Sequence, residues 1–211
     1  MRYTEIDPEH WARKEYFLHY WKDVPCTYSM TVKLDITSLR QKGLKLYPSM
    51  LYCLSKAVNR WEPFRTACRP DGKLVVYDSM SPCYTVFHKD SETFSNLWTE
   101  FAEDYGEFCR RYAEDAARFG SVHAMTAKPD VPENSFTVSM LPWTSFEGFH
   151  LNVNDYRYLL PIFTIGQYQD AGERRSIPLA VQVHHAVCDG YHVSRFLRDL
   201  QENLDACPGS A

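Results

Sequence analysis

The alternation of apolar and polar positions predicts several strands along the chain. Residues 26–36, CTYSMTVKLDI, alternate without a break, which is the period of a strand that has one face covered. Shorter runs that are apolar or alternating and flanked by turn residues predict further strands. These are KLVVYD (73–78), CYTVFH (83–88), SFTVSML (135–141), HLNV (150–153), PIFTIGQYQ (161–169) and IPLAVQVHH (177–185).

Four other stretches have the 3.6-residue period of amphipathic helices, at 7–23, 47–61, 93–120 and 191–204. In the first, Asp7 is a suitable N-cap and Pro8 a suitable first helical residue, and Pro25 follows its end. The third is expected to stop at Gly120.

The order of these elements predicts an α+β protein. Helices and strands are mixed without a regular strand–helix–strand rhythm, and there is no internal repeat, low-complexity tract or linker. A length of 211 residues suits a single domain, 1–211, with a sizeable core. We therefore expect a two-layer sandwich in which helices pack on one face of a mixed β-sheet.

Charge and cysteine content narrow the functional classes. The formal net charge is −4 and no basic stripe occurs, so nucleic acid is not an expected partner. The charged start MRYTEIDPEHWARKEY is not a signal peptide, and no apolar run has the length of a membrane span. Seven cysteines without a CxxC motif predict free thiols, a cytoplasmic protein and no cysteine-based zinc site.

The residues with the clearest potential for catalysis or metal binding lie in VQVHHAVCDGYHVSRFL, residues 181–197. A predicted strand delivers His184 and His185 to its end, and alternation sends their side chains to opposite sides. If one of these histidines lies in a cleft at the strand end, it is either a general base near neutral pH or a structural hydrogen-bonding group. A metal site built from these two histidines with Asp189 and His192 is disfavoured, because adjacent strand residues diverge.

The stretch PLAVQVHHAVCDGYHVSRFL (178–197) resembles the signature of the chloramphenicol O-acetyltransferases. CTYSMTVKLDIT, LYPSMLY, YDSMSPCYTVFHKDSETFSNLW, PENSFTVSMLPWTSFEGFHLNV and PIFTIGQYQ also resemble this family, in order, over nearly the whole chain. The HHxxxDG core alone is shared with the acyltransferase cores of 2-oxo-acid dehydrogenase complexes and with condensation domains. The resemblance implies a CoA-dependent acyltransferase fold and a homotrimer with active sites at the subunit interfaces.

The resemblance also implies a mechanism, with acetyl-CoA as co-substrate and no metal. His185 matches the base that takes the proton of the chloramphenicol hydroxyl as it attacks the thioester. Ser139 matches the donor of a hydrogen bond to the oxyanion, and Thr164 matches a threonine that supports the intermediate through water. Asp189 matches an aspartate that pairs with an arginine of the first helix, here Arg13.

Substrate contacts follow from the same resemblance. The positions that match the antibiotic pocket are Tyr20, Val24, Cys26, Tyr28, Thr85, Phe94, Phe149, Leu151, Val153 and Ile162. Trp143 and Tyr168 match positions along the CoA channel. This chain departs from the family pattern at Thr126-Ala127, where relatives have Phe-Pro, and at Gln167, where relatives often have lysine.

The resemblance places the site between subunits. His185 of one subunit is expected to face a pocket built mostly by its neighbour, from Tyr28, Phe94, Phe149 and Leu151. Two alternatives remain open. An enzyme of the same fold could use another acceptor, such as dihydrolipoamide, although the chain begins at the core's first helix without a lipoyl domain. A non-catalytic trimer could instead sequester the drug.

Overall fold

The computed structural model describes residues 1–151 and 157–209. Their main sheet has the strand order β2-β10-β8-β7-β5-β6, with β9 paired to the end of β10, and a small second sheet has the order β1-β4-β3. The strands are β1 (Tyr3–Glu5), β2 (Thr27–Asp35), β3 (Thr66–Cys68), β4 (Leu74–Tyr77), β5 (Ser81–His88), β6 (Thr93–Trp98), β7 (Ser135–Met140), β8 (Ile162–Ile165), β9 (Gln169–Ala171) and β10 (Arg174–His184).

Both strand directions occur in the main sheet. β5, β7 and β8 are parallel neighbours, whereas β10 runs antiparallel to β2 and β8. The helices are α1 (Lys14–Leu18), α2 (Thr37–Gln41), α3 (Leu46–Arg60), α4 (Tyr105–Phe119) and α5 (Gly190–Asp205), with a π-helical turn at His19–Asp23 and a 3₁₀ turn at Glu62–Phe64. The predicted mixed α+β architecture is confirmed.

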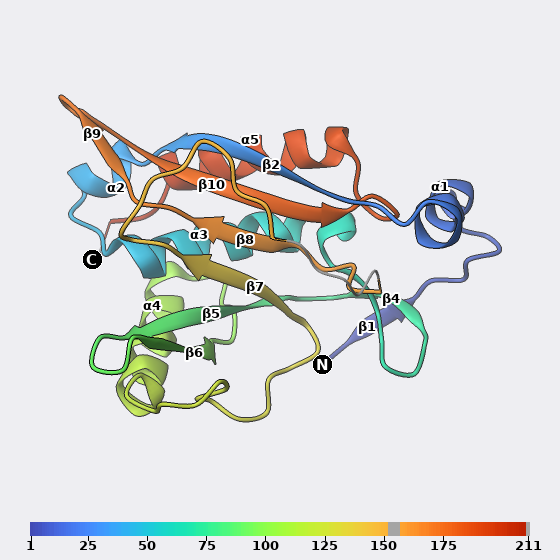
Figure 1. The fold of residues 1–211 in the computed structure, drawn as a ribbon, viewed down its shortest axis with the longest axis horizontal. Coiled ribbons are helices and arrows are strands. Elements are labelled where there is room, and N and C mark those ends of the chain that lie inside the picture. Colours follow the sequence, from blue (N-terminus) through green and yellow to red (C-terminus); the bar gives the residue numbers. More distant parts are fainter. Residues whose placement is uncertain (152–156, 210–211) are drawn as a thin grey trace.

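One face of the main sheet carries the core, because α3 and α5 pack against it (Figure 1). Phe196 of α5 stacks on Phe163 of β8 at 5.4 Å and on Phe64 at 4.4 Å between ring centroids. The inward residues of β10, such as Leu179 and Val181, are buried in the same cluster. We call this the helix face and the opposite side the open face.

The segment 141–151 crosses the open face, and Gly166 gives it room. A Cβ atom on Gly166 would lie 2.7 Å from both the Phe146 ring and Pro178, so a larger residue would displace the segment. Gln167 N donates to Thr144 O at 2.8 Å, and Phe149 N donates to Thr31 Oγ1 at 3.3 Å. The segment is therefore anchored at β8 and again at β2.

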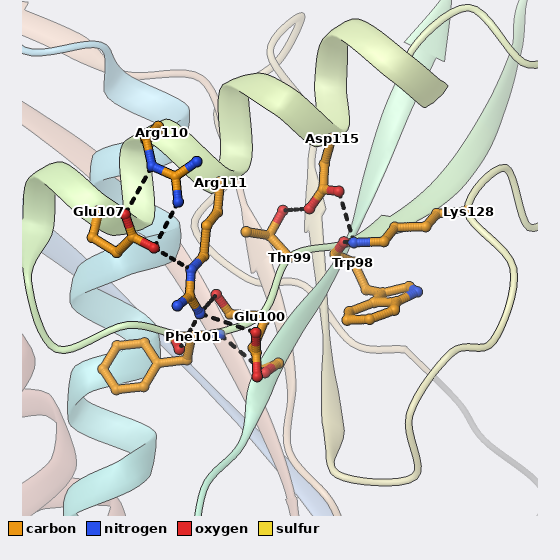
Figure 2. Close-up of polar contacts among 10 residues, drawn as sticks. Trp98, Thr99, Glu100, Phe101, Glu107, Arg110, Arg111, Asp115 and Lys128 are labelled. Atoms are coloured by element: carbon orange, nitrogen blue, oxygen red, sulfur yellow. Dashed lines mark hydrogen bonds and ion pairs between the residues drawn. The ribbon is translucent and has the colours of Figure 1, made fainter.

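Charged side chains fasten α4 to the end of β6 (Figure 2). Asp115 of α4 accepts from Thr99 Oγ1 at 2.8 Å and pairs with Lys128 Nζ at 2.7 Å. Lys128 Nζ also lies 3.7 Å from the centroid of the Trp98 ring. Arg111 donates to Glu107 and to the Phe101 carbonyl, so the turn before α4 is fixed as well.

Two predicted helices were wrong in part. The first begins at Lys14 rather than after Asp7, because the Asp7 carboxylate accepts from Glu9 N at 2.9 Å and holds a local turn that competes with the helix. Residues 93–98 form strand β6 beside β5, and the helix begins only after Asp104, whose side chain accepts from Glu107 N.

The remaining predicted elements correspond closely to the observed ones. The strand predicted at 26–36 is β2, and the helices predicted at 47–61 and 191–204 are α3 and α5. The strand predicted at 150–153 is not found: His150 and Leu151 lie outside any strand, and the rest falls outside the described residues. Short β1 and β3 were not predicted.

Candidate active site

His185 lies directly after β10, where the strand turns into α5. Its backbone N donates to Cys26 O at 2.9 Å, which joins the strand end to the start of β2. Its imidazole stacks on the Tyr20 ring with 4.0 Å between centroids and 6° between planes. The Tyr28 ring lies 5.3 Å away at 60°. The histidine ring is thus held between two aromatic side chains.

Arg13 fixes the loop that carries His185. Its Nη2 donates to His185 O at 3.1 Å and its Nε to Ala186 O at 2.8 Å. Its Nη1 lies 3.0 Å from Asp189 Oδ2, so the expected pair between Arg13 and Asp189 is present. Asp189 also caps α5 by accepting from the backbone N of Tyr191 and His192.

The electrostatics of this loop favour an ionised Asp189. Partial burial acts to raise the pKa of its carboxyl, but the hydrogen bond from Arg13 and the nearby charges outweigh it and hold the pKa below 3.8. Burial lowers the pKa of His192, whose Nδ1 accepts from Asp189 N at 3.2 Å. His184 is buried, and its Nδ1 accepts from Ala186 N at 3.1 Å, which agrees with a structural role.

We call His185, Tyr20, Cys26 and Tyr28 the histidine half of the site. Burial raises the pKa of the Tyr28 hydroxyl. Neither this hydroxyl nor His185 Nδ1 has a hydrogen-bond partner among the described residues, although both atoms are buried. Val24, also a predicted pocket residue, follows the π-helical turn and is exposed.

A second group of predicted residues gathers on the open face. Ser139 of β7 is directly opposite Thr164 of β8, and Thr164 is opposite Ala180 of β10. Phe149 and Leu151 cover a small cavity there. Its lining residues are Ser29, Phe149, Leu151, Ile162, Thr164, Ala180 and Gln182. We call Ser139, Thr164, Ile162, Phe149 and Leu151 the sheet half; Val153 lies outside the described residues.

The remaining predicted contacts are on the same open face or at its rim. Thr85 on β5 shares the face of Ser139, and Phe94 on β6 is opposite Phe87. Phe87 contacts Trp143 edge to face at 4.5 Å between ring centroids. Trp143 is 58% exposed and Tyr168 is 40% exposed, so both predicted CoA-channel rings are accessible.

The two halves do not meet within one chain. Val183 is opposite Tyr28 on the helix face, whereas Ala180, three residues earlier, is opposite Thr164 on the open face. His185 follows Ala180 by five residues, or about 16 Å along a strand, and Ser139 is two strands from β10, or about 10 Å across. Their Cα atoms are therefore roughly 19 Å apart, too far to act on one reacting bond.

The position of Tyr28 corrects one expectation. Tyr28 was assigned to the pocket wall that faces a neighbour's His185, but its ring lies beside His185 of its own chain. Phe149 and Leu151 line the small cavity of the other half. Tyr28 therefore belongs with the histidine half.

Cavity size does not locate this site. A cavity of about 1070 Å³ lies on the outer side of Arg13, between the N-terminal segment and α5, and includes neither His185 nor Ser139.

No group of three or more potential ligands among the described residues could hold a metal ion. Within the same residues, none of the helices has the length and apolar character to cross a bilayer.

Sequence reasoning missed Ser29 and Gln182, which line the small cavity with Thr164. Ser29 Oγ donates a hydrogen bond to Gln182 Oε1 at 3.4 Å. In the sequence, each is only a polar residue on a strand. Most half-exposed strands have such residues, so this pattern does not indicate a binding site. The register of β2 against β10 was needed to bring them together.

The mixed sheet with helices on one face and a histidine at the end of β10 defines a coenzyme A-dependent acyltransferase fold. A solved chloramphenicol acetyltransferase superposes with a TM-score of 0.84 over 96% of this chain and 100% of its own, at 22% identity. The dihydrolipoamide acetyltransferase of Azotobacter vinelandii gives a TM-score of 0.63 over 90% and 86%, at 19% identity. Both similarities establish the fold.

Sequence comparison identifies the family. The model of the chloramphenicol acetyltransferase family matches residues 1–201. A chloramphenicol acetyltransferase of Campylobacter coli is 57% identical over 206 residues, 97% of this chain and 100% of the relative. One of Clostridium perfringens is 54% identical over 98% of this chain and 100% of the relative. This chain belongs to the chloramphenicol acetyltransferase family.

Proposed function

We propose that this chain is an enzyme that transfers the acetyl group of acetyl-CoA to a hydroxyl of chloramphenicol and so inactivates the antibiotic. The observation that carries the proposal is the placement of His185, whose backbone is fixed by Arg13 and Cys26 while its ring stands between Tyr20 and Tyr28. The substrates follow from family membership. The cytoplasm, where acetyl-CoA is available, is the proposed location.

In the proposed reaction, His185 removes the proton of the drug hydroxyl as its oxygen attacks the thioester carbonyl. A hydroxyl is a weak nucleophile near neutral pH, so a positioned base lowers the barrier. The carbonyl oxygen becomes negative, and Ser139 donates a hydrogen bond to it, with Thr164 supporting the intermediate through water. The intermediate collapses, the C–S bond breaks, and the CoA thiolate takes the proton from His185.

We further propose that a complete site forms between two subunits of a homotrimer. The separation of roughly 19 Å between His185 and Ser139 supports this arrangement, because the two groups must lie within a few ångströms of one reacting carbonyl. Each chain then supplies a histidine half to one interface and a sheet half to the next. Such head-to-tail contacts close into a ring.

The direct test is an assay of thiol release from acetyl-CoA with 5,5′-dithiobis(2-nitrobenzoate). Chloramphenicol is expected to support rapid release of CoA thiol, and chloramphenicol that already carries an acetyl group on its primary hydroxyl is expected to support almost none. Dihydrolipoamide is the comparison acceptor, with its product measured by chromatography because it reacts with the reagent itself. Faster acetylation of dihydrolipoamide than of chloramphenicol would reassign the acceptor.

A mixing experiment tests the shared site. His185→Ala removes the base, and Leu151→Trp fills the opposite half; each protein alone is expected to be inactive. After the two are unfolded and refolded together in equal amounts, about one quarter of the sites should pair an intact histidine half with an intact sheet half. Recovery of about a quarter of the wild-type rate is expected. Verified subunit mixing without recovery would show that both halves come from one chain.

A further inference from the structure

The cavity of about 1070 Å³ on the outer side of Arg13 lies apart from both halves of the site. Its volume is comparable with the largest of the pockets that hold small molecules, which measure roughly 300–1000 Å³. Aromatic side chains line it, namely Trp11, Tyr16, Trp61 and Tyr191. Tyr16 and Tyr191 are 61% and 66% exposed, so a ligand can reach their rings. The cavity therefore has the size and the lining of a site for a flat organic molecule.

Arg195 of α5 supplies an uncompensated positive charge to this cavity. Its guanidinium carbon lies 3.9 Å from the centroid of the Trp61 ring and 5.5 Å from that of the Tyr191 ring. Its Nη1 donates to Tyr191 Oη at 3.4 Å, and no carboxylate among the described residues pairs with it. The Trp61 ring is itself fixed, because its Nε1 donates to Asp199 Oδ2 at 2.7 Å. A guanidinium held over a fixed ring loses little further freedom when it binds an anion.

The remaining charges on the cavity wall do not neutralise Arg195. The arginines of the wall are Arg13, Arg60, Arg65 and Arg195, and its acids are Asp7, Glu62 and Asp78. Arg13 and Arg60 have carboxylate partners, and two of the acids also have partners. Among the described residues, Arg65 donates only to backbone carbonyls, and its buried Nε has no hydrogen-bond partner. Arg65 and Arg195 therefore oppose the carboxylate of Glu62, and the wall attracts an anion.

The wall also includes part of the loop that positions His185. Arg13, Val187 and His192 line the cavity, and Arg13 Nη2 donates to His185 O at 3.1 Å. A guanidinium has five N–H groups, and Arg13 uses three of them to hold this loop. An anion in the cavity can accept from the other two and so compete with Asp189 for the guanidinium. Occupation of the cavity then disturbs the support of His185 without contact with the histidine ring.

We propose that this cavity binds aromatic organic anions and that its occupant lowers turnover through Arg13. Arg195 donates to the carboxylate or sulfonate of the ligand, and the rings of Trp61 and Tyr191 contact its flat body. Binding is independent of the proposed function, whereas the effect on turnover rests on it, because it takes His185 as the base. An occupant that acts on the support of His185 should lower kcat and leave KM for chloramphenicol unchanged.

The binding test uses 8-anilino-1-naphthalenesulfonate, an aromatic sulfonate whose fluorescence rises on apolar surfaces. The wild type should bind about one equivalent per chain, and chloramphenicol with CoA, a pair that does not react, should leave this binding unchanged. N-Phenyl-1-naphthylamine, which lacks the sulfonate, should bind about tenfold more weakly, the scale of one charge-assisted hydrogen bond. Equal affinity for the two probes, or displacement by chloramphenicol with CoA, would overturn the proposal without any variant.

Variants of α5 test the role of Arg195. Arg195→Gln should raise Kd for the sulfonate about tenfold, and Arg195→Lys, which keeps the charge without the planar fork, should lose less. Arg198→Gln removes a charge three residues further along α5, outside the cavity, and should leave Kd unchanged. An unchanged Kd in Arg195→Gln, or an equal rise in Arg198→Gln, would show that Arg195 does not recognise the anion.

Steady-state kinetics test the effect on turnover. Saturating 8-anilino-1-naphthalenesulfonate should lower kcat of the wild type and of Arg198→Gln, and Arg195→Gln should need about tenfold more of it for the same loss. An unchanged kcat at saturation would refute the link through Arg13. A wild type that binds the sulfonate but transfers no acetyl group from acetyl-CoA would refute the proposed function and leave the binding site in place.

Discussion

The two halves of the site are built in opposite ways. The histidine half is fixed by backbone hydrogen bonds, an ion pair and stacked rings, and His185 is held from three directions. The sheet half consists of side chains on the open face of a rigid strand ladder, with Phe149 and Leu151 on a segment that crosses it. His185, the proposed base, is thus positioned by tertiary contacts, whereas Ser139 is positioned by strand register.

This contrast predicts that the largest effect arises in the histidine half. His185→Ala should lower kcat on the order of 10³- to 10⁴-fold, because the imidazole of His185 is the proposed acceptor of the hydroxyl proton. Binding of both substrates should persist, which equilibrium dialysis can measure. His10→Ala, on the surface, is the matched control and should keep full activity. Near-normal turnover of the His185 variant would refute the mechanism.

A smaller effect is expected in the sheet half. Ser139→Ala should lower kcat about 100-fold with little change in KM, because the hydrogen bond strengthens as charge develops on the carbonyl oxygen. Ser135→Ala makes the same chemical change four residues earlier on β7 and should have almost no effect. Steady-state kinetics of the two variants measure kcat and KM separately. If Ser139→Ala raises KM and leaves kcat unchanged, Ser139 binds substrate and does not stabilise the oxyanion.

The support of the histidine half predicts a change in stability. In a double-mutant cycle of Arg13→Ala and Asp189→Asn, urea unfolding near neutral pH should give a coupling energy of about 1–2 kcal/mol, since the pair is only partly buried. The pair of Arg2 and Asp78, more exposed and 3.6 Å apart, is the control and should show coupling near zero. Additive effects at Arg13 and Asp189 would mean that their contact contributes no stability.

The ion pair between Arg13 and Asp189 also predicts how its contribution to stability changes with pH. Because the pKa of Asp189 is lower in the folded protein, its contribution is fully present above the unfolded value of 3.8. This contribution is lost as the pH falls through the folded pKa, so the coupling energy should shrink when the cycle is repeated near pH 3. A coupling that stays constant in acid would show that the carboxylate charge is not its source.

Sequence patterns predicted the parts that local chemistry determines. β2 was predicted because its two faces alternate strictly, and α5 because its residues have the 3.6-residue period of an amphipathic helix. Residues 93–98 were assigned to the long helix that ends at Gly120, and only their pairing with β5 makes them a strand. The pattern of residues within 93–98 carries no information about this pairing with another strand.

The candidate site was predictable only in part for a similar reason. The family signature selected His185, Ser139 and Arg13, but no local pattern indicates which residues face each other. The placement of Tyr28 beside its own His185 depends on where β2 meets β10. The contact between Arg195 and Trp61 depends on how α5 packs beside α3 and was not predicted.

The roughly 19 Å between the two halves of one chain has a genetic consequence. If each site joins halves from different chains, a gene copy with a damaged histidine half and another with a damaged sheet half encode proteins that fail alone but complement each other. A cell that carries both alleles would then grow on the antibiotic, whereas neither allele alone would permit growth. Conversely, a chain damaged in both halves would spoil two sites in every trimer that it enters.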